Sequence, residues 1–324
     1  MMSPISTQEP VTILDLEPAP DDFLQDVLAG LGASCRTVPC KYLYDRRGSQ
    51  LFDRICGLPE YYPTRTEIQI MRRHAADIGG ALGPGCLVVE YGSGSSTKTP
   101  ILLDGLEDPG GYVAIDISRA HVVQAVSRLS RSYPDLRMLC VCADYTQPIE
   151  LPRVDDVRRR VVYFPGSTIG NFHRRDAVDF LCRVRGVCEE GGGLLIGVDL
   201  KKSRSMLERA YNDAAGVTAR FNLNVLERMN RELDADFDLA QWRHRACYDM
   251  SLGRIEMHLV SARAQWVHIR EQAFAFGPGE SIRTEVSYKY ALEEFADVGA
   301  EAGFAVQQVW MDAQRLFSVQ FLTA

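Results

Sequence analysis

The chain has 324 residues, a length that fits one large domain or two modest ones. Hydrophobic residues make up 46% and charged residues 24%, the balance of a globular protein that buries its own core. Lys and Arg number 36 against 43 Asp and Glu, which gives a formal net charge of −7. A basic surface for nucleic acid is therefore excluded, and no nucleic-acid partner is expected.

The cysteines and the N-terminal sequence favour a reducing compartment. The nine cysteines are odd in number and form no C-x-x-C motif, so free thiols are expected. The histidines are scattered, and we expect no metal site. The start of the chain lacks the basic and apolar regions of a signal peptide, and no apolar run is long enough to span a bilayer. We expect a cytoplasmic protein with no membrane partner.

The N-terminal quarter of the chain shows weak periodicity. Residues 1–20 are predicted to form a loose arm, followed by a helix at about 21–32 that Asp21 would cap. The stretch 41–66 is rich in aromatic residues and is predicted to be a loop. An amphipathic helix is predicted at about 65–80.

Short apolar runs alternate with helical segments in the middle of the chain. Such runs are typical of strands buried on both faces, and their alternation with helices predicts a parallel α/β sheet. The predicted strands are Leu87–Glu90, Tyr112–Asp116, Met138–Cys142, Val161–Phe164 and Leu194–Asp199, with helices near 97–106, 118–132 and 174–188.

From about residue 202 the pattern changes. Residues 203–232 are predicted to be helical, and Arg254–Val260 and Gln265–Phe276 are predicted to be strands, so we expect an insertion of helices plus an antiparallel sheet. Closer to the C-terminus, a helix and two adjacent strands predict an antiparallel hairpin added to the parallel sheet. These elements are 290–302, Phe304–Trp310 and Leu316–Leu322.

A glycine loop, Gly92-Ser93-Gly94, follows the first strand of the α/β pattern. Glycines at this place let the backbone approach a nucleoside at the positive end of a helix. A dinucleotide-binding loop would carry a third glycine where this chain has Thr97, which disfavours an NAD-dependent oxidoreductase. The preceding acid, Glu90, suits S-adenosylmethionine, whose positive amine it would offset.

Acids also end the next two strands. Asp116 lies 22 residues beyond Gly94 and suits the ribose hydroxyls, and Asp144 with Tyr145 suits the adenine. Lys98 is either an exposed cation or a partner of the cofactor's carboxylate. Each acid alone is an ordinary strand-end turn residue, but together they predict a class I (Rossmann-like) methyltransferase sheet.

Longer motifs extend well beyond the glycine loop. They are Tyr44-Asp45, Gly48-Ser49, Leu51-Phe52-Asp53, Leu58 to Glu67, Gly166 to Asn171, Ala210 to Thr218, Arg254 to Met257 and Thr284 to Ser287. With these motifs the chain, from about residue 35 to its end, resembles the histidine Nα-methyltransferases of ergothioneine biosynthesis, which are S-adenosylmethionine-dependent enzymes.

The resemblance implies two domains and one reaction. The methyltransferase domain would comprise residues 66–201 and 291–324, and a second, α+β substrate-binding domain would comprise residues 1–65 and 202–290. The enzyme would transfer three methyl groups to the α-nitrogen of L-histidine and so produce hercynine, with no metal. A monomer is expected.

The resemblance and the residue chemistry together assign the site. Expected cofactor-binding residues are Tyr44, Glu90, Gly92, Gly94, Lys98, Asp116, Asp144 and Tyr145. Expected substrate-binding residues are Phe52, Tyr61, Gly166, Asn171, Tyr211, Met257, Glu285 and Ser287. The expected catalytic residues are Asn171, which would hold the amine lone pair toward the donor, and Tyr44, which would border the methyl group.

The chemistry of these side chains suits the reaction. Tyr61 and Tyr211 can donate to a carboxylate, Glu285 can accept an imidazole N–H, and Ser287 can serve a ring nitrogen as donor or acceptor. Tyr44 and Phe52 would accommodate a trimethylammonium product through cation–π attraction. Each residue alone is more often a core or turn residue, and only their joint fit to the motifs favours function.

Two alternatives remain open. The first is an Nα-methyltransferase for another amino acid, such as a tryptophan-like one, which loss of Glu285 would favour. The second is a cofactor-binding homologue without catalysis, which the intact acids, Asn171 and both tyrosines disfavour. The chain departs from the family pattern at Tyr91 and at His258, and either residue would change the shape of the pocket.

Overall fold

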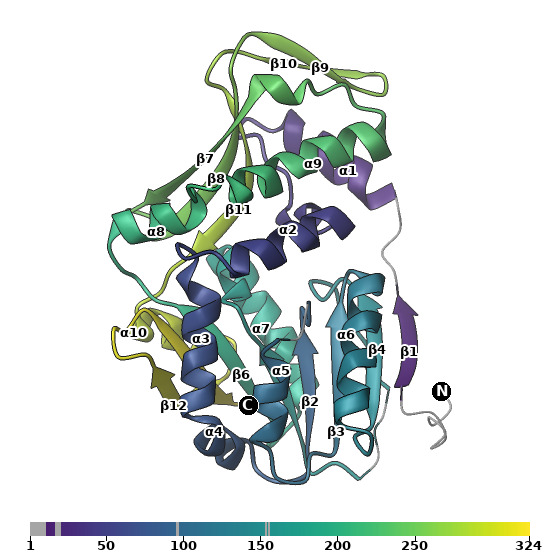
Figure 1. The fold of residues 1–324 in the computed structure, drawn as a ribbon, viewed down its shortest axis with the longest axis vertical. Helices are drawn as coiled ribbons and strands as arrows, with labels where there is room; N and C mark the ends of the chain where they lie inside the picture. The colour runs from purple at the N-terminus through teal and green to yellow at the C-terminus, as the bar shows by residue number, and fades with distance from the viewer. Residues whose placement is uncertain (1–10, 17–20, 95–96, 153, 155) are drawn as a thin grey trace. The chain divides into compact units, whose positions relative to one another are not determined.

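The computed structural model describes residues 11–16, 21–94, 97–152, 154 and 156–324 of the chain (Figure 1). The chain forms two compact units. The large unit comprises 1–18, 63–201 and 290–324, and the small unit comprises 19–62 and 202–289. Within the described ranges, no helix is both long and apolar enough to cross a membrane.

The large unit is built on one eight-stranded sheet, in the order β1-β4-β3-β2-β5-β6-β13-β12. Strands β1 to β6 run parallel, β13 runs antiparallel to β6, and β12 runs antiparallel to β13. This arrangement confirms the predicted parallel sheet with its C-terminal antiparallel hairpin. The strands are β1 (Val11–Leu16), β2 (Cys86–Tyr91), β3 (Gly111–Asp116), β4 (Met138–Ala143), β5 (Arg159–Phe164), β6 (Gly193–Asp199), β12 (Ala305–Met311) and β13 (Phe317–Thr323).

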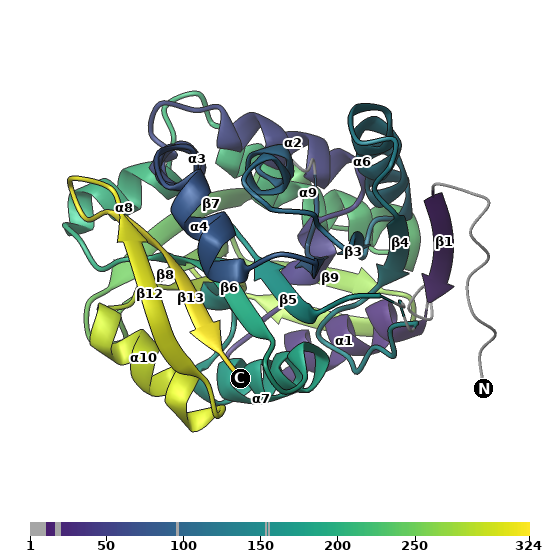
Figure 2. The same ribbon diagram turned by 90° about the horizontal axis from the view of Figure 1, so that it is seen from below.

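Helices cover both faces of this sheet (Figure 2). Side chains of α3, α4, α5 and α6 share a buried cluster with one face, whereas Phe180 of α7 contacts Tyr91 and Phe164 on the other. Each central strand therefore buries alternate side chains on opposite faces, which explains its continuous apolar run. The helices are α3 (Tyr62–Arg73), α4 (Ala75–Leu82), α5 (Thr99–Asp104), α6 (Arg119–Ser132), α7 (Arg174–Cys188) and α10 (Leu292–Glu301).

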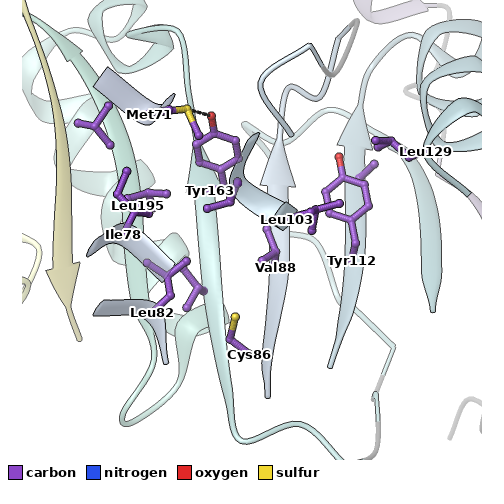
Figure 3. Close-up of a cluster of buried hydrophobic side chains, with 14 of the residues drawn as sticks. Met71, Ile78, Leu82, Cys86, Val88, Leu103, Tyr112, Leu129, Tyr163 and Leu195 are labelled. Carbon is purple, nitrogen blue, oxygen red and sulfur yellow. Dashed lines mark hydrogen bonds between the residues drawn. The ribbon is translucent and has the colours of Figure 1, made fainter. Parts of the chain in front are cut away.

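The core on the first face joins seven strands to four helices, and Figure 3 shows part of it. Val88 of β2 lies fully buried among these side chains, and Tyr163 of β5 donates a hydrogen bond from its hydroxyl to Met71 Sδ at 3.0 Å. Burying an apolar side chain of this size contributes about 1.5–3 kcal/mol. The core therefore holds β2 and β5 rigidly at the centre of the sheet, where the glycine loop begins.

The small unit contains helices and antiparallel strands, as predicted for the insertion. Its three-stranded sheet has the order β11-β8-β7, and β9 pairs with β10 in a separate hairpin. The elements are α1 (Asp21–Gly32), η1 (Cys40–Leu43), α2 (Arg46–Cys56), α8 (Arg204–Tyr211), α9 (Val217–Leu233), η3 (Leu239–Gln241), β7 (Trp242–Asp249), β8 (Arg254–Ser261), β9 (Gln265–Ile269), β10 (Gln272–Phe276) and β11 (Ser281–Tyr288).

The N-terminal segment differs from the prediction of a loose arm. Residues Val11–Leu16 form β1, which pairs in parallel with β4 at the edge of the large sheet. The pattern is weak because an edge strand leaves some apolar side chains, such as Ile13, exposed. The remainder of the predicted arm, 1–10 and 17–20, lies outside the described residues. So does the side chain of Asp21, the predicted cap, although α1 has the predicted bounds.

The predicted loop at 41–66 contains a helix instead. Asp45 begins α2, because its Oδ1 accepts a hydrogen bond from the Gly48 N–H at 2.7 Å. Gly48 weakens the helical pattern in the sequence, yet the fold requires a glycine at this position. A Cβ at that position would lie 1.7 Å from the Leu43 oxygen.

Several other predicted elements are divided in the structure. The helix at 65–80 is two helices separated at His74, and the helical stretch 203–232 is also two, α8 and α9. The strand at 265–276 is the β9–β10 hairpin, which turns at Arg270 with φ +52°. The prediction missed β7 and β11, because polar and charged residues interrupt their apolar runs, even though most of β11 is buried.

Helix α4 packs closely against the end of α5 because both have a glycine at the contact. A Cβ at Gly79 would lie 1.7 Å from the backbone oxygen of Gly105, whereas a Cβ at the neighbouring Gly80 would meet nothing within 4 Å. Only a residue without a side chain at position 79 allows this approach.

We predict opposite effects for alanine at these two adjacent positions. Gly79→Ala should lower the free energy of unfolding by about 1–3 kcal/mol, because backbone must move to admit the methyl group. Gly80→Ala, on the exposed face of the same helix, should raise it by up to about 1 kcal/mol. Urea unfolding of both variants measures the difference, and equal effects would show that the α4–α5 contact is not this close.

Candidate active site

The glycine loop lies where β2 ends, at the centre of the large sheet. Gly92 and Gly94 have φ angles of +69° and +47°, values that favour glycine. Among the described residues that are not its chain neighbours, the nearest atom to a Cβ at Gly94 would be the Gly92 oxygen, at 3.9 Å, so none of them crowds this side of the loop. A Cβ at Gly92 would lie 3.6 Å from the ring of Tyr145, which places the two predicted residues side by side.

Asp116, at the end of β3, fastens this loop. Its Oδ2 accepts the Gly94 N–H at 2.9 Å, and its Oδ1 accepts the Ser118 N–H at 2.8 Å. Burial raises the pKa of Asp116, and these two N–H groups oppose the rise. A carboxylate has about four acceptor positions, so Asp116 retains capacity for hydroxyl groups of a ligand.

Asp144 and Tyr145 follow β4, beside an aromatic cluster. Asp144 Oδ1 accepts hydrogen bonds from the backbone and the hydroxyl of Thr146, at 2.9 and 2.6 Å. The Tyr145 ring stacks on Tyr91, with centroids 5.9 Å apart, and meets Phe164 edge to face. Tyr91, the departure noted in the glycine loop, therefore supports the aromatic face expected for the adenine.

Glu90 has a structural role within the large unit. It is 2% exposed, and its Oε2 accepts hydrogen bonds from Thr99 Oγ1 at 2.7 Å and from the Tyr112 hydroxyl at 2.6 Å. These bonds tie β2 to α5 and to β3. Burial raises the pKa of Glu90 to about 7, and the two hydroxyl donors oppose the rise.

Lys98 forms an ion pair with a residue that the sequence analysis did not identify. The Lys98 Nζ lies 2.5 Å from Oε2 of Glu67, a fully buried residue of α3. The same carboxylate accepts the Gly166 N–H at 3.0 and 3.1 Å. A Cβ at Gly197 would lie 2.2 Å from Glu67 Oε1, so β6 also makes room for this group. Only membership of the motif that ends at Glu67 signalled it, because a charged helical residue is usually exposed.

The loop after β5 carries Gly166 and leads to Asn171. Gly166 and Ser167 both have positive φ, and the Asp199 N–H donates to the Ser167 hydroxyl at 2.9 Å. The short helix η2 (Thr168–Asn171) follows and ends at Asn171. The structure thus links the expected catalytic amide to Glu67 and Lys98 through one constrained loop.

The small unit brings four of its predicted residues into one aromatic cluster. Tyr44 meets Phe52 edge to face at 5.4 Å, Phe52 meets Tyr61 at 6.2 Å, and Tyr61 meets Tyr211 at 6.1 Å. Phe221 of α9, which the sequence analysis missed, contacts both Tyr44 and Phe52. Burial raises the pKa of Tyr61 well above its ordinary value, so its hydroxyl stays protonated and can donate.

Strand β11 supplies the remaining polar groups of the small unit. Glu285 is 9% exposed and pairs in register with Met257 of β8. Burial raises the pKa of Glu285 to about 7, and the charge of Lys289 opposes the rise. No hydrogen-bond donor among the described residues reaches its carboxylate. Ser287 Oγ contacts the hydroxyl of Tyr211 at 3.0 Å and Lys289 Nζ at 2.8 Å.

The large unit defines the class of protein. Its parallel sheet changes direction of winding at β2, where the open glycine loop lies beside acids that end β3 and β4. Ligands of such sheets bind at this switch point. The Asp116 and Asp144 carboxylates, the Tyr145 ring and the open glycine loop fit a nucleoside, and the fold is that of a class I methyltransferase.

Comparison with known proteins identifies the family. A protein family described as "Histidine-specific methyltransferase, SAM-dependent" matches residues 23–324 of the chain. The chain is 42% identical over 306 residues to a histidine N-alpha-methyltransferase of Mycolicibacterium smegmatis, covering 92% of this chain and 94% of that protein. It is 39% identical to one of Mycobacterium tuberculosis, covering 89% and 90%. An ergothioneine biosynthesis protein 1 of Neurospora crassa is 31% identical, over 85% of this chain and 32% of that protein. The chain belongs to the family of histidine-specific, S-adenosylmethionine-dependent methyltransferases.

We predict that Glu67 is essential for the stability of the large unit. Glu67→Gln removes the charge that Lys98 requires, and should lower the free energy of unfolding by about 3 kcal/mol. The matched control, Glu301→Gln, breaks an exposed pair with Arg174 and should change it by at most about 1 kcal/mol. Urea unfolding measures both, and a small effect at Glu67 would contradict the role of this pair.

Proposed function

We propose that the chain transfers three methyl groups from S-adenosylmethionine to the α-amino nitrogen of L-histidine. The product would be hercynine, and the reaction the first step of ergothioneine biosynthesis. Family membership over residues 23–324 supports the reaction type. The observation that carries the substrate is Glu285, a buried carboxylate without a protein donor among the described residues. Such a group is costly unless a ligand supplies an N–H, and an imidazole ring has one to give.

The large unit would hold the cofactor, which supplies an electrophilic methyl group on a sulfonium. Asp116 accepts from the ribose hydroxyls, and Asp144 with Tyr145 binds the adenine. The amino acid part lies over the glycine loop, where Glu90 would offset its positive amine. Lys98 has three N–H donors, of which Glu67 takes one, so it can also reach a carboxylate.

Alignment of the reacting atoms is the main task of the remaining residues. The amide oxygen of Asn171 accepts from the α-amine and directs its lone pair, while the hydroxyls of Tyr61 and Tyr211 hold the amino and carboxylate ends. The nucleophile must be neutral, and desolvation beside a cation lowers the pKa of an amine without a strong base. Aromatic faces of Tyr44 and Phe52 would stabilise the trimethylammonium product.

We also propose that the protein acts as a cytoplasmic monomer without nucleic acid. The net charge of −7 supports the absence of a nucleic-acid partner, and the cysteine usage supports a reducing compartment. Light scattering of the purified protein tests the oligomeric state directly.

A mass-spectrometric assay tests the substrate. Purified protein with S-adenosylmethionine and each of the twenty amino acids should methylate histidine alone, in mono-, di- and trimethylated α-amine forms. Fragmentation distinguishes the α-nitrogen from the ring nitrogens. Methylation on the ring, of tryptophan in preference, or of no amino acid would each contradict the proposed function.

Glu285→Ala should separate substrate from cofactor binding. Loss of the N–H acceptor should lower kcat/KM for histidine about a hundredfold or more, whereas the calorimetric affinity for S-adenosylmethionine should stay nearly unchanged. Glu271→Ala, at an exposed turn of the same unit, is the matched control and should behave as wild type. Equal losses for both ligands would remove the imidazole role from Glu285.

A further inference from the structure

Asn222 of α9 is a fully buried amide that none of the motifs includes. Its Nδ2 lies 2.9 Å from His244 Nδ1 and donates to the His258 backbone oxygen at 3.2 Å. Its Oδ1 accepts a hydrogen bond from Thr284 Oγ1 at 2.5 Å. His244 lies on β7, His258 on β8 and Thr284 on β11. One side chain of the helix thus contacts all three strands of the sheet in the small unit.

Two backbone carbonyls fix the direction of these bonds. The His258 oxygen can only accept, so the donor end of the amide, Asn222 Nδ2, must face it. The same Nδ2 faces His244 Nδ1, which is therefore an unprotonated acceptor. The other ring nitrogen, Nε2, lies 2.8 Å from the Tyr211 backbone oxygen and must carry the ring proton. The network holds His244 as a neutral ring with its proton on Nε2.

This network has no satisfied arrangement for a charged His244 ring. A second ring proton would set an N–H of His244 against the N–H of Asn222. Turning the amide would relieve that contact but would set Asn222 Oδ1 against the His258 oxygen. Burial lowers the pKa of His244, the Tyr211 backbone oxygen and the charge of Asp213 oppose this, and the charge of His258 adds to it. The neutral ring is therefore the form that fits these surroundings.

The third partner, Thr284, is the extra residue of a β-bulge in β11. Two successive pairs of the ladder are Arg283 with His258 and Glu285 with Met257, so β11 has one residue more than β8 between them. Thr284 is that residue. Its hydroxyl donates to Asn222 and also lies 3.2 Å from the Met257 backbone oxygen. The amide therefore anchors the bulge to α9.

The bulge decides which face of the sheet carries Glu285. Residues directly opposite each other on antiparallel strands share a face, and a shift of one residue moves a side chain to the other face. With the bulge, Glu285 pairs with Met257, which is expected to line the substrate site. Without the bulge, Glu285 would pair with Glu256, whose side chain lies on the opposite face of β8. The orientation of the expected imidazole acceptor thus depends on this irregularity.

We propose that Asn222 is a positioning residue for the substrate-binding groups of the small unit. Through the bulge at Thr284 it directs Glu285, and through His244 it holds the backbone of Tyr211. One amide thus sets the expected ring acceptor and an expected donor to the other end of the substrate relative to each other. The identity of the substrate rests on the proposed function, whereas the network rests on the geometry of the strands and the helix.

Nitrogen NMR of the assigned histidine rings tests the network in the wild type. At pH 7 His244 should carry a proton on Nε2 and none on Nδ1. Because its pKa is lowered, the ring should stay neutral as the pH falls through the ordinary histidine value of about 6.5 and become charged only at lower pH. A proton on Nδ1 at pH 7, in either the neutral or the charged ring, would overturn the proposal without any variant.

Asn222→Asp tests the positioning role. The carboxylate has the size of the amide but no N–H, so the His258 oxygen loses its donor and His244 Nδ1 faces an acceptor. The pKa of His244 should rise, because the charged ring now has a partner for both protons. The kcat/KM for histidine should fall about tenfold or more, mainly through KM. The calorimetric affinity for S-adenosylmethionine should stay nearly unchanged.

The matched control is Asn230→Asp, on the same helix. Asn230 Nδ2 donates to the Phe237 backbone oxygen at 2.8 Å, and its Oδ1 accepts the Phe237 N–H at 2.8 Å. This change also leaves a carbonyl without its donor, so it should lower the melting temperature but keep the wild-type kcat/KM for histidine. Equal losses of kcat/KM in the two variants would reduce Asn222 to a structural residue. A folded Asn222→Asp protein with wild-type kcat/KM would also overturn the proposal.

Thr284→Val is a milder variant that tests the bulge by itself. Valine keeps the branched shape and removes only the hydroxyl that joins the bulge to Asn222. The kcat/KM for histidine should fall, while NMR should still show the neutral His244 ring. An unchanged kcat/KM would show that Glu285 does not depend on this bond and would overturn the proposal even where Asn222→Asp fails to fold. Failure of the wild type to methylate histidine would instead overturn the proposed function.

Discussion

A carboxylate enclosed in the large unit links the segments on which the cofactor site depends. Glu67 is fully buried, and a charge in such surroundings persists only when donors surround it. Lys98, at the start of α5, and the Gly166 N–H, in the loop after β5, are those donors. Loops that follow two different strands thus converge on one side chain of α3. The position of Lys98 and the course of the loop toward Asn171 are therefore set together.

The small unit also contains a buried charged group, but there the charge is positive and its neighbours are hydrogen-bond acceptors. There the buried charge is the ammonium of Lys289, and the hydroxyls of Ser287 and Tyr211 accept from it. Hydroxyls differ from carboxylates in that they also carry a proton, which cannot point toward the ammonium. In both units a buried ion limits the orientation of its neighbours, which is what a site with defined hydrogen-bond polarity requires.

The sequence predicted the large sheet well because most of its strands are buried on both faces. Such strands are apolar runs, and β2 to β6 were found where those runs occur. The edge strand β1 and the strands β7 and β11 mix polar and apolar residues without a regular pattern, and periodicity could not find them. Helix α2 was missed because Gly48 weakens a helical pattern, although the close approach to Leu43 requires glycine there.

The candidate site divides in a similar way. Asp116 and Asp144 could be placed from sequence because they end strands, and parallel strands end at one edge of a sheet. Glu67 and Lys289 could not, because a charged residue on a helix or after a strand is usually exposed. Their burial comes from contacts between segments 31 to 99 residues apart in one case, and 78 in the other. Local hydrophobic periodicity gives no information about contacts between residues so far apart in the sequence.

Glu90 and Glu285 have similarly perturbed pKa values but different surroundings. Burial raises the pKa of both to about 7. Glu90 accepts two hydroxyl donors and ties strands together, whereas no donor in the described part of the chain reaches Glu285. The unmet acceptor, not the pKa, distinguishes Glu285 from Glu90. Methyl transfer from a sulfonium depends chiefly on alignment, so the role proposed for Glu285 is to recognise an N–H group, and no general base is required.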